Sequence, residues 1–141
     1  MRDIVEAMES GRTLAEVQGI TGEIGDAIAG LAEAEFEAGR IDVARAILEG
    51  LVVTNHEDAG AWALLSRAHR RLANPLAARF CAEVALKLAP EDPGVRLVRA
   101  ESLLAAPEER AAARAELALL AACEDPEVAP RAGALLGALS E

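Results

Sequence analysis

Aromatic side chains are scarce in this sequence, whose 141 residues include two phenylalanines, one tryptophan and no tyrosine. Proteins that bind single-stranded nucleic acid stack bases on aromatic rings and attract phosphates with basic surfaces, whereas this chain has a formal charge of −10. Nucleic acid is therefore not an expected partner. No apolar run reaches the roughly 20 residues that span a bilayer, and the first residues lack the features of a signal peptide. We expect a cytoplasmic protein that does not insert into membranes.

Cysteine and histidine are equally few. Cys81 and Cys123 are far apart and form no CxxC pair, which favours buried free thiols over a redox or metal role. His56 and His69 belong to no metal-binding motif, and the chain has neither a glycine-rich phosphate loop nor a nucleophile elbow. We therefore expect no catalytic residue, no metal site and no cofactor, and so not an enzyme.

The sequence is rich in alanine and leucine, and 52% of its residues are hydrophobic, which suits one helical domain. Residues 59–92 have the pattern of a helix–turn–helix unit. Trp62, Leu65, Ala78, Ala85 and Pro90 stand at the positions at which a tetratricopeptide repeat carries its large residue, its leucine, its small alanines and its closing proline. We expect Trp62 to pack inside this unit.

The same 34-residue frame fits the sequence on both sides of this unit. Gly39 supplies a turn in residues 25–58, whereas Arg96 and Arg99 stand at apolar positions of residues 93–126. About three such units are needed to bury a continuous core. We predict an all-α fold, a short right-handed solenoid of three tetratricopeptide-like repeats (residues 25–58, 59–92 and 93–126). Residues 1–24 are expected to form an N-terminal helical segment, and residues 127–141 a C-terminal capping helix.

Capping residues predict where the helices begin. A good cap precedes a proline at Asn74-Pro75, Asp92-Pro93 and Asp125-Pro126, and Pro107 marks a further start. Residues 13–16 form a capping-box sequence, and Leu14, Val17 and Ile20 recur at spacings of three, beginning within it. We predict that this apolar stripe supports a homodimer.

Charge is unevenly distributed along the chain. Residues 60–100 hold more basic than acidic side chains, whereas the flanking parts are acidic. The arginines of the middle unit form either a solvated helix face or a surface that binds a partner, and composition does not decide between the two.

Several motifs point to a known family. They are Gly11-Arg12-Thr13-Leu14, Val17, Gly19-Ile20-Thr21, Gly39-Arg40-Ile41, Ala44, residues 51–56 and residues 99–104. With these motifs, residues 10–122 resemble the class II chaperones of bacterial type III secretion. The resemblance implies a bacterial cytoplasmic chaperone, often homodimeric, that binds an extended segment of hydrophobic translocator proteins in a concave groove of its repeats. Such a chaperone keeps the translocators soluble before export.

The resemblance also implies which residues line the groove, because the inward-facing positions of the first helix can be counted in each unit. They are Ala29, Glu33, Phe36, Ala63, Arg67, Arg70, Arg71, Leu97, Glu101 and Leu104. The apolar members would accept small apolar side chains of the cargo, and the arginines would pair with its carboxylates or carbonyls.

Several alternatives stay open. Phe36 could pack in the core, and the arginines could pair with Glu33, Glu37 or Glu101 on neighbouring helices, which would neutralise the groove. The chain could be a general tetratricopeptide scaffold that binds another protein's tail, unconnected with secretion. Within secretion, the cargo could instead be a needle or filament subunit.

Overall fold

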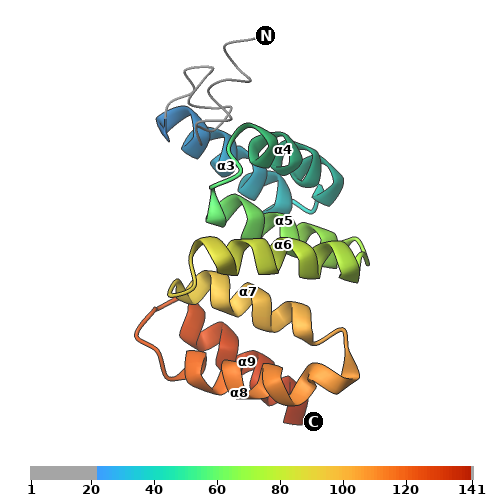
Figure 1. The fold of residues 1–141 in the computed structure, drawn as a ribbon, viewed down its shortest axis with the longest axis vertical. Coiled ribbons are helices and arrows are strands. Elements are labelled where there is room, and N and C mark those ends of the chain that lie inside the picture. Colours follow the sequence, from blue (N-terminus) through green and yellow to red (C-terminus); the bar gives the residue numbers. More distant parts are fainter. Residues whose placement is uncertain (1–21, 141) are drawn as a thin grey trace.

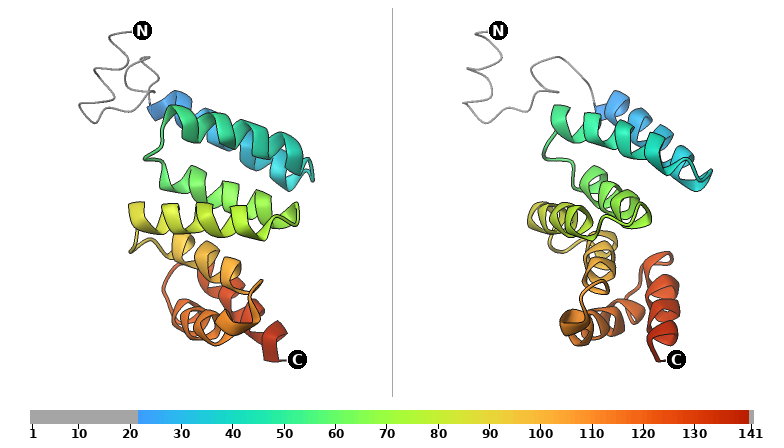
Figure 2. Two further views of the ribbon diagram at one scale, coloured as in Figure 1. Left: turned by 45° about the vertical axis from the view of Figure 1, so that its right-hand side comes forward. Right: turned by 90° about the vertical axis from the view of Figure 1, so that its right-hand side faces the viewer.

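The computed structural model describes residues 22–140, and the regular elements of this part of the chain are all helices. Its elements are α3 (Gly22–Glu37), α4 (Ile41–Thr54), α5 (Ala59–Arg71), α6 (Pro75–Leu88), α7 (Pro93–Leu103), the 3-10 turn η1 (Pro107–Glu109), α8 (Arg110–Ala121) and α9 (Val128–Ser140). Consecutive helices pack against one another, and the hairpins α3–α4, α5–α6 and α7–α8 stack in chain order with α9 at the end (Figure 1). Two further views show the same succession of layers (Figure 2). The predicted all-α fold is therefore confirmed.

The first two hairpins turn by the same backbone device. The amide of Gly39 donates to the carbonyl of Phe36, and the amide of Arg40 donates to that of Glu35. This is the pairing by which a residue with positive φ ends a helix, and Gly39 has a φ of 86°. Ala73 occupies the equivalent place after α5 with a φ of 60°, although it carries a Cβ. Ala73 therefore holds a conformation that suits glycine better.

Aspartates cap three of the helices. Asp58 accepts a hydrogen bond of 3.0 Å from the amide of Ala61, and Asp92 accepts two from the first turn of α7. Asp125 accepts bonds from the amides of Glu127 and Val128, which lower the pKa of its carboxyl. The cap predicted at Asp125 is observed, although α9 itself begins at Val128, two residues after the predicted start at Pro126. Asn74 precedes α6 without a side-chain cap.

Leucine and alanine build the core. Leu48, Leu97, Leu103, Leu117 and Leu120 are the largest fully buried apolar side chains. Buried alanines lie between the helices, at positions 32, 44, 68, 82, 85, 100, 113 and 132. Because an alanine adds only a methyl group, neighbouring helix axes can approach closely, and a core with few aromatic residues is still filled.

Trp62 packs at the junction of two core clusters, those of α3–α6 and α5–α7. Its indole Nε1–H donates a hydrogen bond of 2.9 Å to the carbonyl of His56, which satisfies the one polar atom of the ring. The partly buried ring also meets Phe80 edge to face, with 6.2 Å between the centroids. The packing role predicted for Trp62 is thus observed.

The sequence-based domain limits stay a prediction. We propose to keep residues 25–58, 59–92 and 93–126 as the three repeats, with residues 1–24 and 127–141 as flanking segments.

The predicted dimer residues lie outside the described part of the chain. They are Leu14, Val17 and Ile20. Within residues 22–140, no helix has both the length and the apolar character needed to cross a membrane.

Candidate functional site

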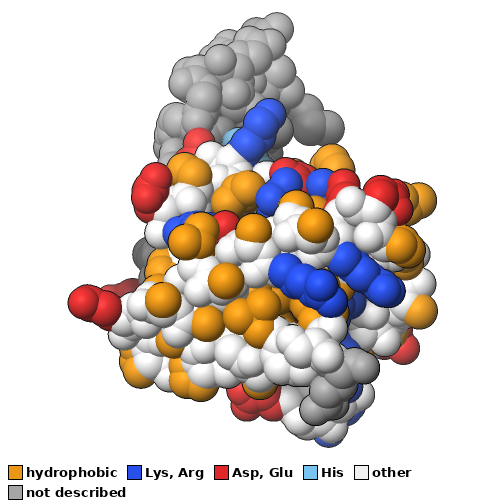
Figure 3. Space-filling view, turned by 90° about the horizontal axis from the view of Figure 1, so that it is seen from below, with side chains coloured by type: hydrophobic (Ala, Val, Ile, Leu, Met, Phe, Trp, Pro, Cys, Tyr) orange, Lys and Arg blue, Asp and Glu red, His pale blue; other side chains and the backbone are white. Residues whose placement is uncertain are grey.

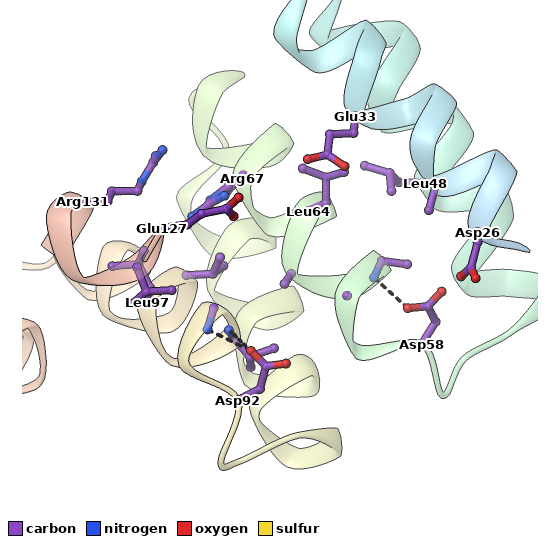
Figure 4. A pocket seen from close by; sticks show the side chains of 18 residues that line it. Asp26, Glu33, Leu48, Asp58, Leu64, Arg67, Asp92, Leu97, Glu127 and Arg131 are labelled. Atoms are coloured by element: carbon purple, nitrogen blue, oxygen red, sulfur yellow. Dashed lines mark hydrogen bonds between the residues drawn. The ribbon is translucent and has the colours of Figure 1, made fainter. Parts of the chain in front are cut away.

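The site begins with a cavity of about 530 Å³ on the face that α3, α5, α7 and α9 share. We call this cavity and its lining the groove. Figure 4 shows the 18 residues that line it, which come from these four helices, from the residues directly before α5, α7 and α9, and from one side chain of α4. The first helix of each hairpin thus contributes to one continuous surface, as the sequence pattern predicts for a repeat solenoid.

The lining residues recur in rows, one repeat apart. Ala29, Ala63, Leu97 and Arg131 form one row, and Asp26, Gly60, Gly94 and Val128 form another. Both rows continue onto α9, so α9 occupies the place of the first helix of a fourth unit. A segment predicted only to cap the stack therefore also lines the groove.

Small residues make the groove hollow. Gly60 and Gly94 lie in the first turns of α5 and α7, and Ala61 and Ala63 follow. A Cβ added at Gly60 would meet only a carboxylate oxygen of Asp58, at 3.5 Å, which is an ordinary contact. The absence of side chains at Gly60 and Gly94 is therefore what leaves space for a ligand backbone to approach.

A buried carboxylate organises the basic side chains beside the groove. The Glu101 side chain is 2% exposed, and its oxygens accept hydrogen bonds from Arg67 at 3.1 Å and from Arg70 at 2.9 Å. Arg131 from α9 forms a third ion pair with it at 3.3 Å. Three guanidiniums from α5 and α9 thus converge on one carboxylate of α7. The sequence left open whether the predicted groove arginines pair with a glutamate of a neighbouring helix. Arg67 and Arg70 do so, with Glu101.

Acidic side chains gather at the other side of the groove. Asp26, Asp58 and Asp92 stand near the N-terminal ends of α3, α5 and α7, away from Arg67 and Arg131 (Figure 4). Asp58 and Asp92 each use one oxygen as a helix cap, which leaves the second oxygen of the carboxylate for other partners. The starts of α3, α5 and α7 therefore form the acidic side of the groove, and the opposite side, which we call basic, holds Arg67 and Arg131 together with Glu127.

Half of the predicted groove residues line this cavity, namely Ala29, Glu33, Ala63, Arg67 and Leu97. Leu97 is only 1% exposed and belongs to the hydrophobic core of the C-terminal end. It therefore lies beneath the groove and offers little accessible surface. Their role in binding a peptide stays a prediction.

The other five predicted residues lie elsewhere. The guanidinium of Arg71 stacks over the ring of Phe36 at 5.4 Å from its centroid, outside the groove lining. Arg70 and Glu101 border a second cavity of about 340 Å³, which the turn after α5 and the end of α7 also line. Leu104 is partly buried directly after α7.

Sequence reasoning missed several lining residues. Asp26, Gly60 and Gly94 share one repeat position, so the same counting could have found them. Arg131 follows Leu97 by one repeat, but this signal is visible only if residue 127 is taken as the start of a fourth unit. Its pairing with Glu101 depends on how α9 packs, which local sequence does not specify.

Charge is also uneven on the outer surface. Seen from the end at which α8 and α9 lie, hydrophobic side chains are scattered and basic side chains adjoin one another, while the acidic ones lie mostly toward the edges (Figure 3). The net charge of −10 is thus no guide to the charge of any single face.

Comparison with solved structures gives several likenesses that span nearly the whole chain. A T3SS complex from Aeromonas hydrophila matches with 24% identity and a TM-score of 0.78, over 99% of this chain and 96% of that chain. The type III secretion translocator chaperone SycD of Yersinia enterocolitica matches with 21% identity and a TM-score of 0.75, over 89% and 97%. PcrH from Pseudomonas aeruginosa matches with 23% identity and a TM-score of 0.71, over 86% and 96%.

Peptide complexes are known for two of these proteins. SycD has been solved with a peptide of the translocator YopD, and PcrH with the chaperone binding regions of PopD and PopB. No protein-family model and no curated protein matches the chain. The likeness is therefore one of architecture, and this chain has the fold of the type III secretion translocator chaperone SycD and of PcrH.

Proposed function

We propose that this protein is a cytoplasmic chaperone of bacterial type III secretion. It binds an extended segment of a hydrophobic translocator protein in the groove and keeps that translocator soluble before export. The observation that carries the proposal is a cavity built by the first helices of successive hairpins, in a fold shared with chaperones solved in complex with translocator segments.

The dimensions of the groove suit an extended peptide. Packed helices are about 8–10 Å apart, so a chain that crosses from α3 to α9 traverses about 25–30 Å. An extended peptide rises about 3.3 Å per residue, so about eight or nine residues cover this distance. The glycines and alanines of the lining leave room for its backbone, and the partly buried Leu64 offers an apolar contact to a peptide side chain.

The proposed role is binding without catalysis. The side chains that line the groove are carboxylates, two arginines and aliphatic groups, and the lining includes no serine, cysteine or histidine. Arg67 and Arg131 are held by Glu101, and the caps Asp58 and Asp92 by backbone amides. These arrangements position charge for recognition, and they supply no nucleophile next to a base.

A homodimer is part of the proposal. The stripe Leu14, Val17 and Ile20 would supply its interface, and SycD is known in more than one dimer. Sedimentation of the full chain at tens of micromolar should give the mass of two copies. A single-copy mass at that concentration would refute the dimer but not the chaperone role.

Filling the groove tests the proposal. Gly60→Phe places a ring in the groove from a helical position where a Cβ meets no steric obstacle, and Gly50→Phe places the same ring on an exposed part of α4 as the matched control. Tagged wild-type protein, captured from its native cells, should bring down a protein with long apolar segments. Gly50→Phe should retain that partner, and Gly60→Phe should lose it while its circular dichroism stays helical.

The captured partner must then depend on the chaperone for solubility. When it is expressed alone in a laboratory bacterium it should be insoluble, and co-expression with the wild type or with Gly50→Phe should keep it in the supernatant. Capture of partners that are soluble by themselves would instead support the general scaffold. Equal capture by both variants would remove the groove from the mechanism.

A further inference from the structure

We infer that the basic side of the groove is a receptor for an acidic side chain, so that the bound segment carries an aspartate or glutamate that contacts Arg67 and Arg131. This inference rests on the proposed function, because it specifies which peptides the groove accepts. The arginine cluster consists of Arg67, Arg70 and Arg131 around Glu101. Support of the fold alone does not require three arginines there, and the inference gives them a role in binding.

The cluster carries more positive charge than it neutralises. Arg67, Arg70 and Arg131 bring three guanidinium charges to Glu101, which supplies one negative charge. Ion pairing alone would need one arginine, and each further guanidinium adds repulsion at short range. An excess of positive charge is therefore held in place beside the groove.

Two of the three arginines face the groove. Arg67 and Arg131 line it, whereas Arg70 borders the second cavity on the other side of Glu101. Their side chains are 27% and 52% exposed, so both are accessible to a ligand. The Nε atom of Arg67 is buried and has no hydrogen-bond partner in the described part of the chain. Because that Nε atom is shielded from solvent, the donors open to a ligand are those in the exposed parts of the two guanidiniums.

Two neighbouring acids lie in the same groove without pairing with these arginines. Glu33 and Glu127 line the same groove, yet among residues 22–140 neither forms an ion pair with Arg67 or Arg131. A carboxylate from a bound peptide can therefore pair with guanidiniums that Glu101 already orients. Because these side chains are ordered before binding, less conformational entropy is lost when the ligand arrives.

The acidic side of the groove fixes where the ligand's carboxylate goes. Asp26, Asp58 and Asp92 would repel an acidic side chain placed near the starts of α3, α5 and α7. The guanidiniums of Arg67 and Arg131 attract it. Charge complementarity therefore selects one direction for the bound segment, in addition to its composition.

A displayed peptide library tests the inference with the full-length protein. Ten-residue random peptides, fused at their C-terminus so that they carry no free terminal carboxylate, are selected on the wild type and on Arg131→Gln. Arg131 stands at the rim, and its loss leaves Glu101 paired with Arg67 and Arg70. Arg114→Gln, on α8 outside the groove lining, is the matched control.

Each outcome of the selection decides something. Apolar peptides with one fixed acidic position, lost on Arg131→Gln but kept on Arg114→Gln, support the receptor. Enriched apolar peptides without an acidic position overturn it and leave the proposed chaperone groove intact. No enrichment on the wild type overturns both.

Synthetic peptides of the enriched sequence then measure the preference by fluorescence polarisation. Exchanging the peptide's glutamate or aspartate for its amide should weaken wild-type binding about tenfold, as expected for a charge-assisted pair. The Glu101→Gln variant removes the carboxylate that competes with the peptide for the arginines. It should therefore increase the ratio between the affinities of the acidic peptide and its amide. A mere loss of structural support for the fold would not increase that ratio. Glu116→Gln, which disturbs an ion pair with Arg96 outside the groove, should leave the ratio unchanged. A ratio near one on the wild type would refute the receptor.

Discussion

Arg67 on α5 and Glu101 on α7 occupy the same position of successive units, 34 residues apart, and are joined by a hydrogen bond of 3.1 Å. Because Glu101 also binds Arg70 and Arg131, one carboxylate links three helices, α5, α7 and α9. The same contact thus belongs both to the support of the stack and to the basic side of the groove. Stability and binding should therefore respond together to changes at Glu101.

Glu101→Ala should lower the free energy of unfolding by about 1–3 kcal/mol, because three guanidiniums lose a buried partner. The value lies below that for a fully buried pair, since the arginines are partly exposed and water can solvate them. Urea denaturation followed by circular dichroism measures the change. Glu116→Ala breaks the partly exposed ion pair between Glu116 and Arg96. It should lower the free energy of unfolding by less than about 1 kcal/mol. Equal losses in the two variants would contradict the central role of Glu101.

The fold was largely predictable from local signals. The turn glycine at position 39 and the aspartate cap at position 92 act over a few residues, and each is observed in its predicted role. Trp62 was also recognisable, because its repeat position implies packing inside the hairpin. Local pattern therefore specified the helices and their pairing.

The details of the site depend on contacts that local pattern does not contain. Arg67 and Glu101 were both predicted to face inward, but whether they meet a ligand or each other depends on the distance between α5 and α7. Arg131 joined them only because α9 packs as a first helix of a further unit. Phe36 was a reasonable groove residue, yet it lies under Arg71 at the ends of α3 and α5. Tertiary packing decides these outcomes.

Ala73→Gly should stabilise the protein by about 0.5–1 kcal/mol. Ala73 has a φ of 60°, where a Cβ crowds the neighbouring carbonyl, and glycine adopts this conformation without strain. Part of the gain is offset because glycine gives the unfolded chain more freedom. Thermal and urea unfolding, compared with the wild type, measure the effect.

The reverse exchange at the equivalent turn is the matched control. Gly39 has a φ of 86° and open space around its missing Cβ, so Gly39→Ala introduces backbone strain without a steric clash. It should destabilise by about 1 kcal/mol. If both exchanges changed stability in the same direction, the two turns would not be equivalent.

The Cys81 thiol should react very slowly in the folded protein. Burial raises its pKa to about 11, so at pH 8 roughly one molecule in a thousand carries the reactive thiolate. In the Cys123→Ala background, alkylation by iodoacetamide should be at least about 100-fold slower than that of a free cysteine, and urea should restore the ordinary rate. Rapid labelling in the native state would show that α6 opens and exposes Cys81.

The same raised pKa has a consequence for stability at high pH. A thiol whose folded pKa lies above its unfolded value stabilises the fold fully below the unfolded pKa, and this contribution is lost as pH rises through the folded pKa. Between about pH 9 and pH 11, the wild type should therefore lose stability faster than Cys81→Ala. Identical pH profiles for the two proteins in urea denaturation would contradict the raised pKa of Cys81.

Glu83 should make a small contribution to stability that acid removes. Although burial opposes ionisation, hydrogen bonds of 2.9 Å from Arg99 and Arg79 lower the pKa of Glu83 below its usual 4.5. A carboxyl whose folded pKa is depressed stabilises the fold above its unfolded pKa, and this stabilisation is lost as pH falls from about 4.5 through the folded value. Because the side chain is 42% exposed, solvent screening limits the contribution to less than about 1 kcal/mol. Glu83→Gln should therefore be less stable than the wild type at pH 7 and nearly equal to it at pH 3, and Glu108→Gln, the same exchange at an exposed glutamate, is the matched control. A difference in the urea midpoint that persists unchanged at pH 3 would show that Glu83 stabilises the fold by packing and not by its charge.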